Sequence, residues 1–156
     1  WSDNYKNLSV SAQARLVVEN DDKASMYSVK DLYDGIFSEV KVPITFDFHH
    51  HRFQPGDLSE QEAFELAMTT WQYHNVKPLF HYSSCRRTFE DPGCKAQAHA
   101  DFIYEQINDY GHAVDIEVEA KAKEVAVLKY KDDTDSLLES YLPFDVHIDN
   151  QLVLEV

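Results

Sequence analysis

The chain has 156 residues, and 28 acidic residues against 14 basic ones give it a formal net charge of −14 with neutral histidines. An apolar content of 44% is enough for a folded core and excludes a disordered tail, and no apolar run reaches the roughly 18 residues of a membrane span. The acidic balance argues against a general polyanion binder, because affinity for DNA depends on neutralising phosphates with Lys and Arg. Two cysteines, Cys85 and Cys94, are too few for a disulfide framework and predict free thiols in an intracellular protein.

The first half of the chain alternates short apolar segments with amphipathic ones. Ser28 followed by Asp31 is typical of a helix start, and Pro43 is tolerated at the start of a strand. The pattern predicts the end of a helix with its loop, a strand, a helix, a strand and a loop, over residues 1–13, 16–18, 28–37, 42–48 and 49–57 in that order.

The second half continues this alternation, starting from a capping box formed by Ser59 and Glu62. The predicted order is helix, strand, helix, strand and helix, over residues 59–71, 78–82, 98–107, 113–119 and 120–131. Regular alternation with about 30 residues per unit predicts an α/β fold with parallel strands and right-handed crossovers. The pattern breaks at Asp132, after which we expect only a short helix over 137–142 and a final strand over 151–156.

Each predicted strand ends on a side chain that can bind a metal ion: Glu19, Asp47, His81 and Glu119. In parallel α/β folds, ligands bind at the carboxyl ends of the strands. Burying so many ligands at equivalent positions needs a partner, because unpaired buried charge is costly, and a divalent cation supplies one. Mixed carboxylate and imidazole ligands suit Zn, Mn or Fe better than Ca.

Two more histidines extend this set. His50 lies three residues after Asp47. His99 lies at the start of the helix predicted over 98–107, where Asp101 is spaced to orient it. The resulting six ligands are more than one ion needs. We therefore expect a cluster of two or three divalent ions, the usual device for phosphodiester hydrolysis.

Single residues of this set have simpler explanations. The run His49 to His51 is compatible with a solvated loop, and Glu119 is close enough in sequence to Lys121 and Lys123 for a surface ion pair. These explanations do not account for metal-competent side chains at four successive strand ends.

At these residues the sequence resembles the UV damage endonuclease family. The matching stretches occur in order over residues 13–128 and are Arg15 to Lys23, Pro43 to His51, Pro78 to Ser84, His99 to Ile103 and Asp115 to Glu124. The resemblance implies the last four β/α units of a (β/α)8 TIM barrel of the xylose-isomerase-like superfamily. It also implies a metal-dependent DNA repair enzyme that nicks double-stranded DNA on the 5′ side of UV photoproducts.

Residue by residue, the resemblance implies a metal site that uses the same six side chains. The ligands are Glu19, Asp47, His50, His81, His99 and Glu119, and the four of them at strand ends are the candidate catalytic residues. Manganese is the metal that the resemblance favours, with Mg, Zn and Co as alternatives.

The chain departs from the family pattern in two ways. Leu79 stands where the family often has a lysine that can be carboxylated and bridge metals. A whole barrel takes about 250 residues, so the sequence corresponds to a C-terminal half over residues 1–131 and an extension of unknown role over 132–156. We expect this chain alone to be inactive, because the missing N-terminal half supplies further ligands and the residues that probe the damaged bases.

The DNA contacts predicted from the sequence follow His81. Ser83, Ser84, Arg86 and Arg87 are candidates for holding phosphate, Arg bidentately. Two or three divalent ions would add roughly +4 to +6 at the site, which reconciles an acidic chain with a DNA substrate.

Two other classes of protein are compatible with part of the pattern. A sugar isomerase or epimerase of the same superfamily would use similar ligands on a small hydroxy-ketone. A truncated, non-catalytic barrel module would explain Leu79 and the missing half, but would leave the acidic ligands repelling one another.

Overall fold

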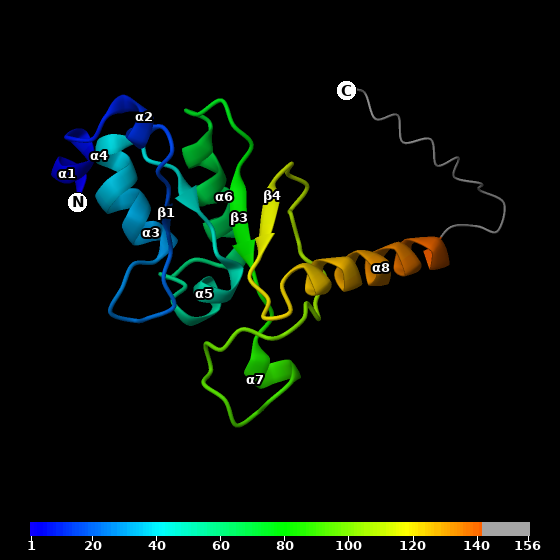
Figure 1. The fold of residues 1–156 in the computed structure, drawn as a ribbon. Helices are drawn as coiled ribbons and strands as arrows, with labels where there is room; N and C mark the ends of the chain where they lie inside the picture. Colours follow the sequence, from blue (N-terminus) through cyan, green and yellow to red (C-terminus); the bar gives the residue numbers. More distant parts are fainter. Residues whose placement is uncertain (142–156) are drawn as a thin grey trace, which may run out of the picture.

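The strands form at the apolar segments and lie parallel to one another in a mixed α/β arrangement (Figure 1). The computed structural model describes the backbone of residues 1–141 and the side chains of residues 1–136. β1 (Val18–Glu19) pairs with β2 (Ile44–Thr45), and β3 (Leu79–Tyr82) pairs with β4 (Asp115–Val118), both pairs in parallel. A parallel bridge between Asp47 and His81 joins the two pairs, so the strands follow one another in chain order.

β2 and β3 are hydrogen-bonded only near their carboxyl ends, because side chains of α6 (Glu60–Trp71) bond to the main chain at the start of β2. The amide of Ile44 donates to Thr70 Oγ1 at 2.9 Å, and Trp71 Nε1 donates to the Ile44 carbonyl at 2.8 Å. After the end of β2, the amide of His81 donates to the Phe46 carbonyl at 2.9 Å. The four strands are therefore hydrogen-bonded into one sheet only toward their carboxyl ends.

Two of the helices predicted from the sequence begin where expected, after Ser28 and after Ser59. Their bounds are α1 Ser2–Lys6, α2 Val10–Gln13, α3 Val29–Leu32, a π-helical turn Tyr33–Phe37, α4 Ser38–Val40, α5 Phe48–Phe53, α6 as given, α7 Arg86–Phe89 and α8 Glu124–Tyr141. The capping boxes Ser28–Asp31 and Ser59–Glu62 are both present, with the serine accepting the third amide and the carboxylate accepting the serine amide. These two predictions are confirmed.

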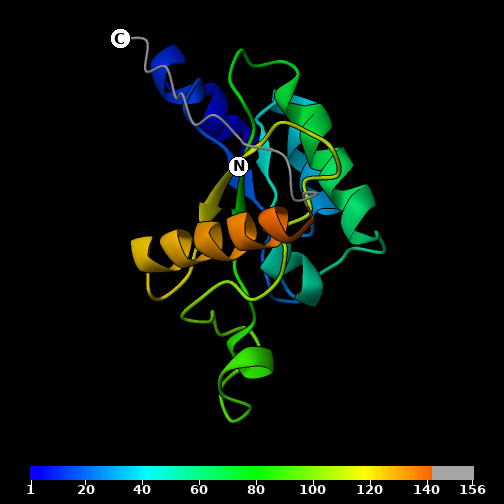
Figure 2. The ribbon, with the colours of Figure 1, turned by 90° about the vertical axis from the view of Figure 1, so that its right-hand side faces the viewer.

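An aromatic cluster forms the core between the strands and α6. Four rings are completely buried and pack edge to face or tilted, with ring centroids 4.7 to 6.0 Å apart: Phe46, Phe48, Phe64 and Phe80. Figure 2 shows α8 crossing in front of the strands, while the segment around α7 projects beyond their carboxyl ends. The core thus fixes the strand ends that carry the candidate ligands.

One predicted helix is absent: residues 98–107 contain no helix. Several of their main-chain amides bond to side chains elsewhere in the chain instead of to the preceding turn. The Glu90 carboxylate accepts from the amides of Asp101 and Phe102, and Tyr130 accepts from the amide of Ile107. The predicted loops after β2 and β3 instead contain the short helices α5 and α7.

The carboxyl-terminal elements differ from the prediction in two respects. The helix expected over 120–131 begins only at Glu124, since the amides of Lys121 and Ala122 bond to the carbonyls of Ala100 and Asp101. α8 continues without interruption past Asp132, where the sequence pattern breaks, and its backbone is helical to Tyr141. The expected short helix over 137–142 falls partly, and the expected strand over 151–156 falls wholly, outside the described residues.

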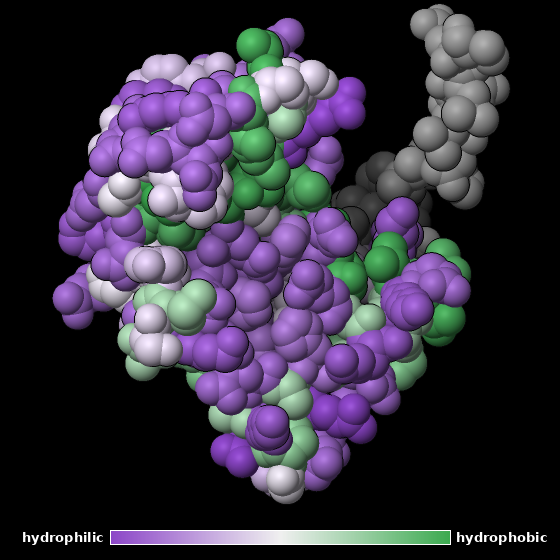
Figure 3. Space-filling view, turned by 60° about the vertical axis from the view of Figure 1, so that its left-hand side comes forward, coloured by the Kyte–Doolittle hydropathy of each residue, from purple (hydrophilic) through white to green (hydrophobic). Residues whose placement is uncertain are grey.

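β1 lies at an edge of the described part of the sheet. Leu16 and Val17, directly before it, remain 38% and 41% exposed. The view from this side of the molecule is mostly hydrophilic, with a hydrophobic strip in its upper half (Figure 3). No helix among the described residues is long and apolar enough to cross a membrane.

Candidate metal centre

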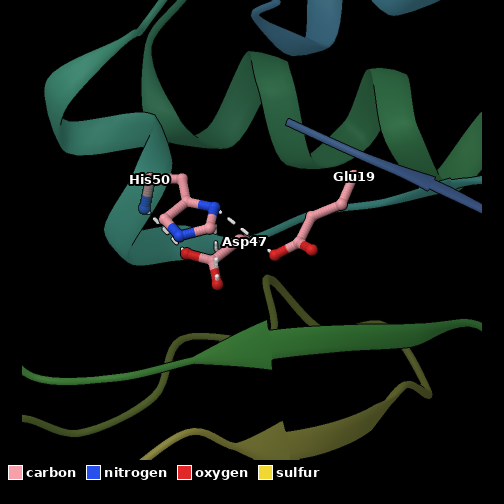
Figure 4. Close-up of side chains that lie close together, drawn as sticks. All are labelled: Glu19, Asp47 and His50. Atoms are coloured by element: carbon pink, nitrogen blue, oxygen red, sulfur yellow. Dashed lines mark hydrogen bonds and ion pairs between the residues drawn. The ribbon is translucent and has the colours of Figure 1, made fainter. Parts of the chain in front are cut away.

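Acidic and imidazole side chains converge where the strands end. Glu19 is the last residue of β1, Asp47 follows β2, and Glu119 follows β4 with its amide bonded to the Tyr82 carbonyl at 2.9 Å. The side chains form two groups, and within each group the potential ligand atoms all lie within 4.8 Å of one another. The first group is Glu19, Asp47 and His50, and the second is Asp47, His81 and Glu119. Figure 4 shows the first group, with the carboxylates and the ring pointing toward one another. Asp47 belongs to both groups and lies at their centre.

Asp47 is completely buried and only partly hydrogen-bonded. One carboxylate oxygen caps α5 by accepting the amide of His50 at 2.7 Å. The other, Oδ2, has no hydrogen-bond partner among the described residues, and His50 Nδ1 lies 3.9 Å from it. Burial raises the pKa of Asp47 to about 6; the nearby carboxylates of Glu19 and Glu119 act in the same direction, while His50 opposes them.

Asn20 fixes the main chain of Asp47, a role that the sequence pattern did not indicate. The Asn20 side chain is buried, accepts the Asp47 amide at 2.8 Å and donates to the Asp47 carbonyl at 3.0 Å. This pair of bonds ties the end of β1 to the end of β2. The sequence offered one signal for this role: Asn20 directly follows Glu19, the candidate ligand at the end of β1.

The tautomers of two histidines follow from their acceptors. His50 Nδ1 lies 2.8 Å from the Asn20 carbonyl, and His99 Nδ1 lies 3.0 Å from the Glu119 carbonyl. A carbonyl oxygen only accepts, so Nδ1 carries the proton and, in the neutral ring, Nε2 has the lone pair. Metal-binding histidines are usually oriented in this way.

The predicted orienting role of Asp101 is wrong. Its carboxylate lies 3.6 Å from Arg86 Nη1, and the Glu119 main chain orients His99 instead. His99 is also the one predicted ligand outside both groups of three: its Nδ1 lies 3.6 Å from the Glu119 carboxylate. It therefore flanks the centre next to Glu119.

His81 is surrounded by carboxylates. Its Nδ1 lies 3.0 Å from Glu19 Oε1 and 3.6 Å from Glu119 Oε1, while its Nε2 lies 3.7 Å from Glu117 Oε2. The hydrogen bond to Glu19 outweighs burial and raises the pKa of His81. Burial alone would raise the pKa of Glu19, but His81 and His50 hold it below its usual value. Glu117 was not predicted, although it lies two residues before Glu119 on the same face of β4.

The neighbours of His50 in the triple histidine point elsewhere. His49 is completely buried, its Nε2 lies 3.1 Å from the Gln97 carbonyl, and its ring centroid lies 5.0 Å from that of His99. His51 is buried against Phe46. Burial lowers the pKa of both rings, that of His49 to about 4, so both are neutral at neutral pH.

The residues predicted to hold DNA phosphates divide into two kinds. Ser83 and Ser84 are completely buried, and Ser84 Oγ accepts the amide of Tyr104 at 3.0 Å. Arg86 is partly exposed beside Glu90 and Asp101, and Arg87 is exposed, with its Nε donating to the Cys94 carbonyl. Only the arginines therefore reach solvent.

The donor set fits a divalent cation. Asp47 Oδ2 is a buried carboxylate oxygen without a partner in the described part of the chain, and carboxylate and imidazole atoms surround it. Glu19, Asp47, His50, His81 and Glu119 would hold the ions, with His99 at the side. Leu79 lies two residues before His81 on the same strand face and offers no ligand atom.

Comparison with known proteins points to one family. The profile of the family described as UV-endonuclease UvdE matches residues 1–145. The UV-damage endonuclease of Schizosaccharomyces pombe is 36% identical over 131 residues, which are 81% of this chain and 21% of the relative. The UV DNA damage endonuclease of Bacillus cereus is 30% identical over 138 residues, which are 83% of this chain and 41% of the relative.

A solved structure agrees with these relatives. The crystal structure of SacUVDE superposes with a TM-score of 0.68 at 31% identity, covering 87% of this chain and 45% of that one. The chain thus spans less than half the length of the relatives that it matches. With a family profile that covers residues 1–145 of 156, the chain belongs to the UV-endonuclease UvdE family.

Proposed function

We propose that this chain carries the metal centre of an intracellular DNA repair endonuclease that nicks double-stranded DNA on the 5′ side of UV photoproducts. The observation that carries the proposal is the convergence of Glu19, His81 and Glu119 on Asp47, a buried carboxylate with one oxygen that has no hydrogen-bond partner among the described residues, in a member of this family. Two or three divalent ions, manganese first among them, are the proposed cofactors, with Mg, Zn and Co as alternatives.

The chain's own residues would prepare the site for phosphate chemistry. Glu19, Asp47 and Glu119 would hold the cations, while the Nδ1–H bonds of His50 and His99 to carbonyls leave their Nε2 atoms available. Bound divalent cations supply electrostatic stabilisation of the charge that develops on phosphate during hydrolysis. The bonds from Asn20 keep Asp47 in place, so the site is organised before substrate arrives.

The proposed fold of the whole enzyme is a (β/α)8 barrel, of which residues 1–131 form the last four units. The parallel strands follow one another in chain order and bring their ligands to one end, as barrel strands do. β1 and β4 each have one partner strand in the described part of the chain, which leaves an edge of each for the rest of a barrel. Residues 132–156 are proposed as an extension outside these units.

Arg86 and Arg87 are the proposed phosphate contacts beyond the metal centre. They lie on α7, which projects from the same end of the strands as the ligands (Figure 1). Guanidinium groups bind phosphate bidentately, and Arg87 has no carboxylate partner among the described residues.

The test is nicking of UV-irradiated supercoiled plasmid, in Mn²⁺, by the protein as its gene encodes it. We expect nicks in irradiated plasmid, none after chelation, and a loss of at least about 100-fold in rate for Glu19→Gln, which removes a charged ligand. The matched control Glu39→Gln changes a surface glutamate on α4 that lies 4.0 Å from Lys6, and it should leave the rate unchanged.

Two results would count against the proposal. One is equal nicking with and without divalent metal; the other is a Glu19→Gln variant as active as the parent. Sequencing of the nicked ends tests the predicted 5′ position separately. The 156-residue chain assayed alone should be inactive, because the four strands of its described part are too few to close a barrel.

A further inference from the structure

We propose that His49 is a positioning residue for His99, holding that side chain in place for the cation without touching the cation itself. The inference rests on the metal centre proposed above and assigns a role to a buried histidine that this centre does not use.

His49 reaches the His99 segment from a distant part of the chain. It lies on α5, and its Nε2 donates to the carbonyl of Gln97, two residues before His99, at 3.1 Å. Its ring packs edge-on to the His99 ring, with centroids 5.0 Å apart and planes at 74°. One side chain therefore contacts both the main chain that carries His99 and the imidazole itself.

The His99 segment needs such contacts because it has no helix of its own. Its main chain is tied to the α7 segment by Arg86 N to Ala98 O at 2.8 Å and by Ala100 N to Ser84 O at 2.9 Å. These bonds fix the backbone. The ring is fixed by the bond from its Nδ1 to the Glu119 carbonyl and by the edge of His49.

Packing alone does not account for a histidine at position 49. The ring is completely buried, and because Nε2 donates to a carbonyl, Nδ1 is left as an acceptor with no partner among the described residues. A buried polar atom without a partner destabilises the fold, whereas an apolar side chain of the same size would not. What the imidazole adds is the single hydrogen bond to Gln97.

His49 is also separate from the ligands. It belongs to neither group of atoms that could hold an ion, and its Nε2 proton is committed to the carbonyl. Substitution of residues that orient a metal-binding histidine typically lowers metal affinity about 10- to 100-fold.

The experiment compares His49→Gln with His49→Met in the protein as its gene encodes it. Gln and Met have the same length, but only Gln offers a donor to the Gln97 carbonyl. Binding is measured by calorimetric titration with Mn²⁺ and by the visible absorption spectrum of bound Co²⁺, and folding by circular dichroism. We expect His49→Met to weaken binding roughly 10-fold or more with an altered Co²⁺ spectrum, and His49→Gln to remain within about 3-fold of the parent.

The matched control is His51→Met, which removes another buried histidine of α5 that packs on Phe46 and not on His99. It should leave affinity and spectrum unchanged. If His49→Met fails to fold, His49→Phe keeps the ring volume and takes its place.

The outcomes separate the two proposals. Parent-like binding by the Met and Phe variants, equal losses in the Gln and Met variants, or an equal loss in His51→Met would each overturn the role of His49. A parent chain that binds neither Mn²⁺ nor Co²⁺ would overturn the metal centre itself, and the inference with it.

Discussion

Asp47 is the residue at which the stability of the chain and its proposed chemistry conflict. Its carboxylate is buried, one oxygen has no partner in the described structure, and Glu19 and Glu119 add negative charge nearby. The nearby His50 does not offset the cost of burying this carboxylate, so its ionised form destabilises the fold, and the pKa of about 6 expresses that cost. A divalent cation would remove the conflict.

The first prediction is that Asp47→Asn stabilises the metal-free chain. The pKa of the folded state lies near 6, above the ordinary value of 3.8, so the penalty is absent at low pH and grows as pH rises between these values. Asn keeps an oxygen for the His50 amide and never ionises. We expect thermal unfolding in EDTA to show a gain of roughly 1–3 kcal/mol above pH 7 and almost none near pH 4.

Asp115→Asn is the control for this substitution. Asp115 lies at the opposite end of β4 and pairs with Lys77 at the surface, where an ion pair contributes little. It should change the unfolding temperature slightly at either pH. The first prediction is contradicted if Asp47→Asn is less stable than the parent at pH 8 in EDTA.

The triple histidine shows what could not be read from the sequence at this scale. The spacing of Asp47 and His50 indicated a pair of ligands, and the structure brings them together. The segment was expected to be a loop, yet it forms α5, where successive side chains point about 100° apart. That rotation sends His49 toward His99 and His51 toward Phe46, which no local pattern reveals.

At the scale of elements, starts and strands were predictable where the signal is local. The two capping boxes mark real helix starts because each needs only residues three positions apart. The helix expected over 98–107 failed because Glu90 and Tyr130, distant in sequence, take its amides. Long-range hydrogen bonds of this kind override helix propensity and leave no trace in the local sequence.

The second prediction concerns the turn that covers the start of α3. Gly56 has a φ of +59°, and a Cβ at this position would overlap the side chain of Ser28, which caps α3. Gly56→Ala therefore strains the backbone and displaces the cap at once. We expect it to lower the free energy of unfolding by about 2–4 kcal/mol, the combined effect of backbone strain, overpacking and a lost cap, as measured by urea denaturation.

Gly111→Ala separates these contributions. Gly111 has a φ of +78°, but a Cβ added there would meet nothing within 4 Å among the described residues, so the substitution strains the backbone alone. Its cost should be about 1 kcal/mol. Equal losses in the two variants would mean that the Ser28 contact has no energetic consequence.

At the scale of the whole molecule, the charge of −14 has a local counterpart. Three carboxylates, from Glu19, Asp47 and Glu119, come from distant parts of the chain and meet at one end of the strands. Folding thus concentrates negative charge that the unfolded chain keeps apart, which disfavours the native state without a cation. The acidic composition argues against DNA binding only if no bound cation neutralises these carboxylates.

The last prediction follows from that concentration of charge. A cation that binds the folded chain and not the unfolded one stabilises it by about 2.7 kcal/mol at a concentration 100-fold above its dissociation constant. We expect Mn²⁺ or Co²⁺ to raise the unfolding temperature of the 156-residue chain reversibly, and Ca²⁺ to do so much less, because the ligands include imidazoles. Glu19→Gln should remove most of the Mn²⁺ effect, whereas Glu39→Gln at the surface should retain it. An equal rise with Ca²⁺, or in Glu19→Gln, would mean that cations act by screening the acidic surface, because a site built from both carboxylates and histidines favours Mn²⁺ or Co²⁺ over Ca²⁺.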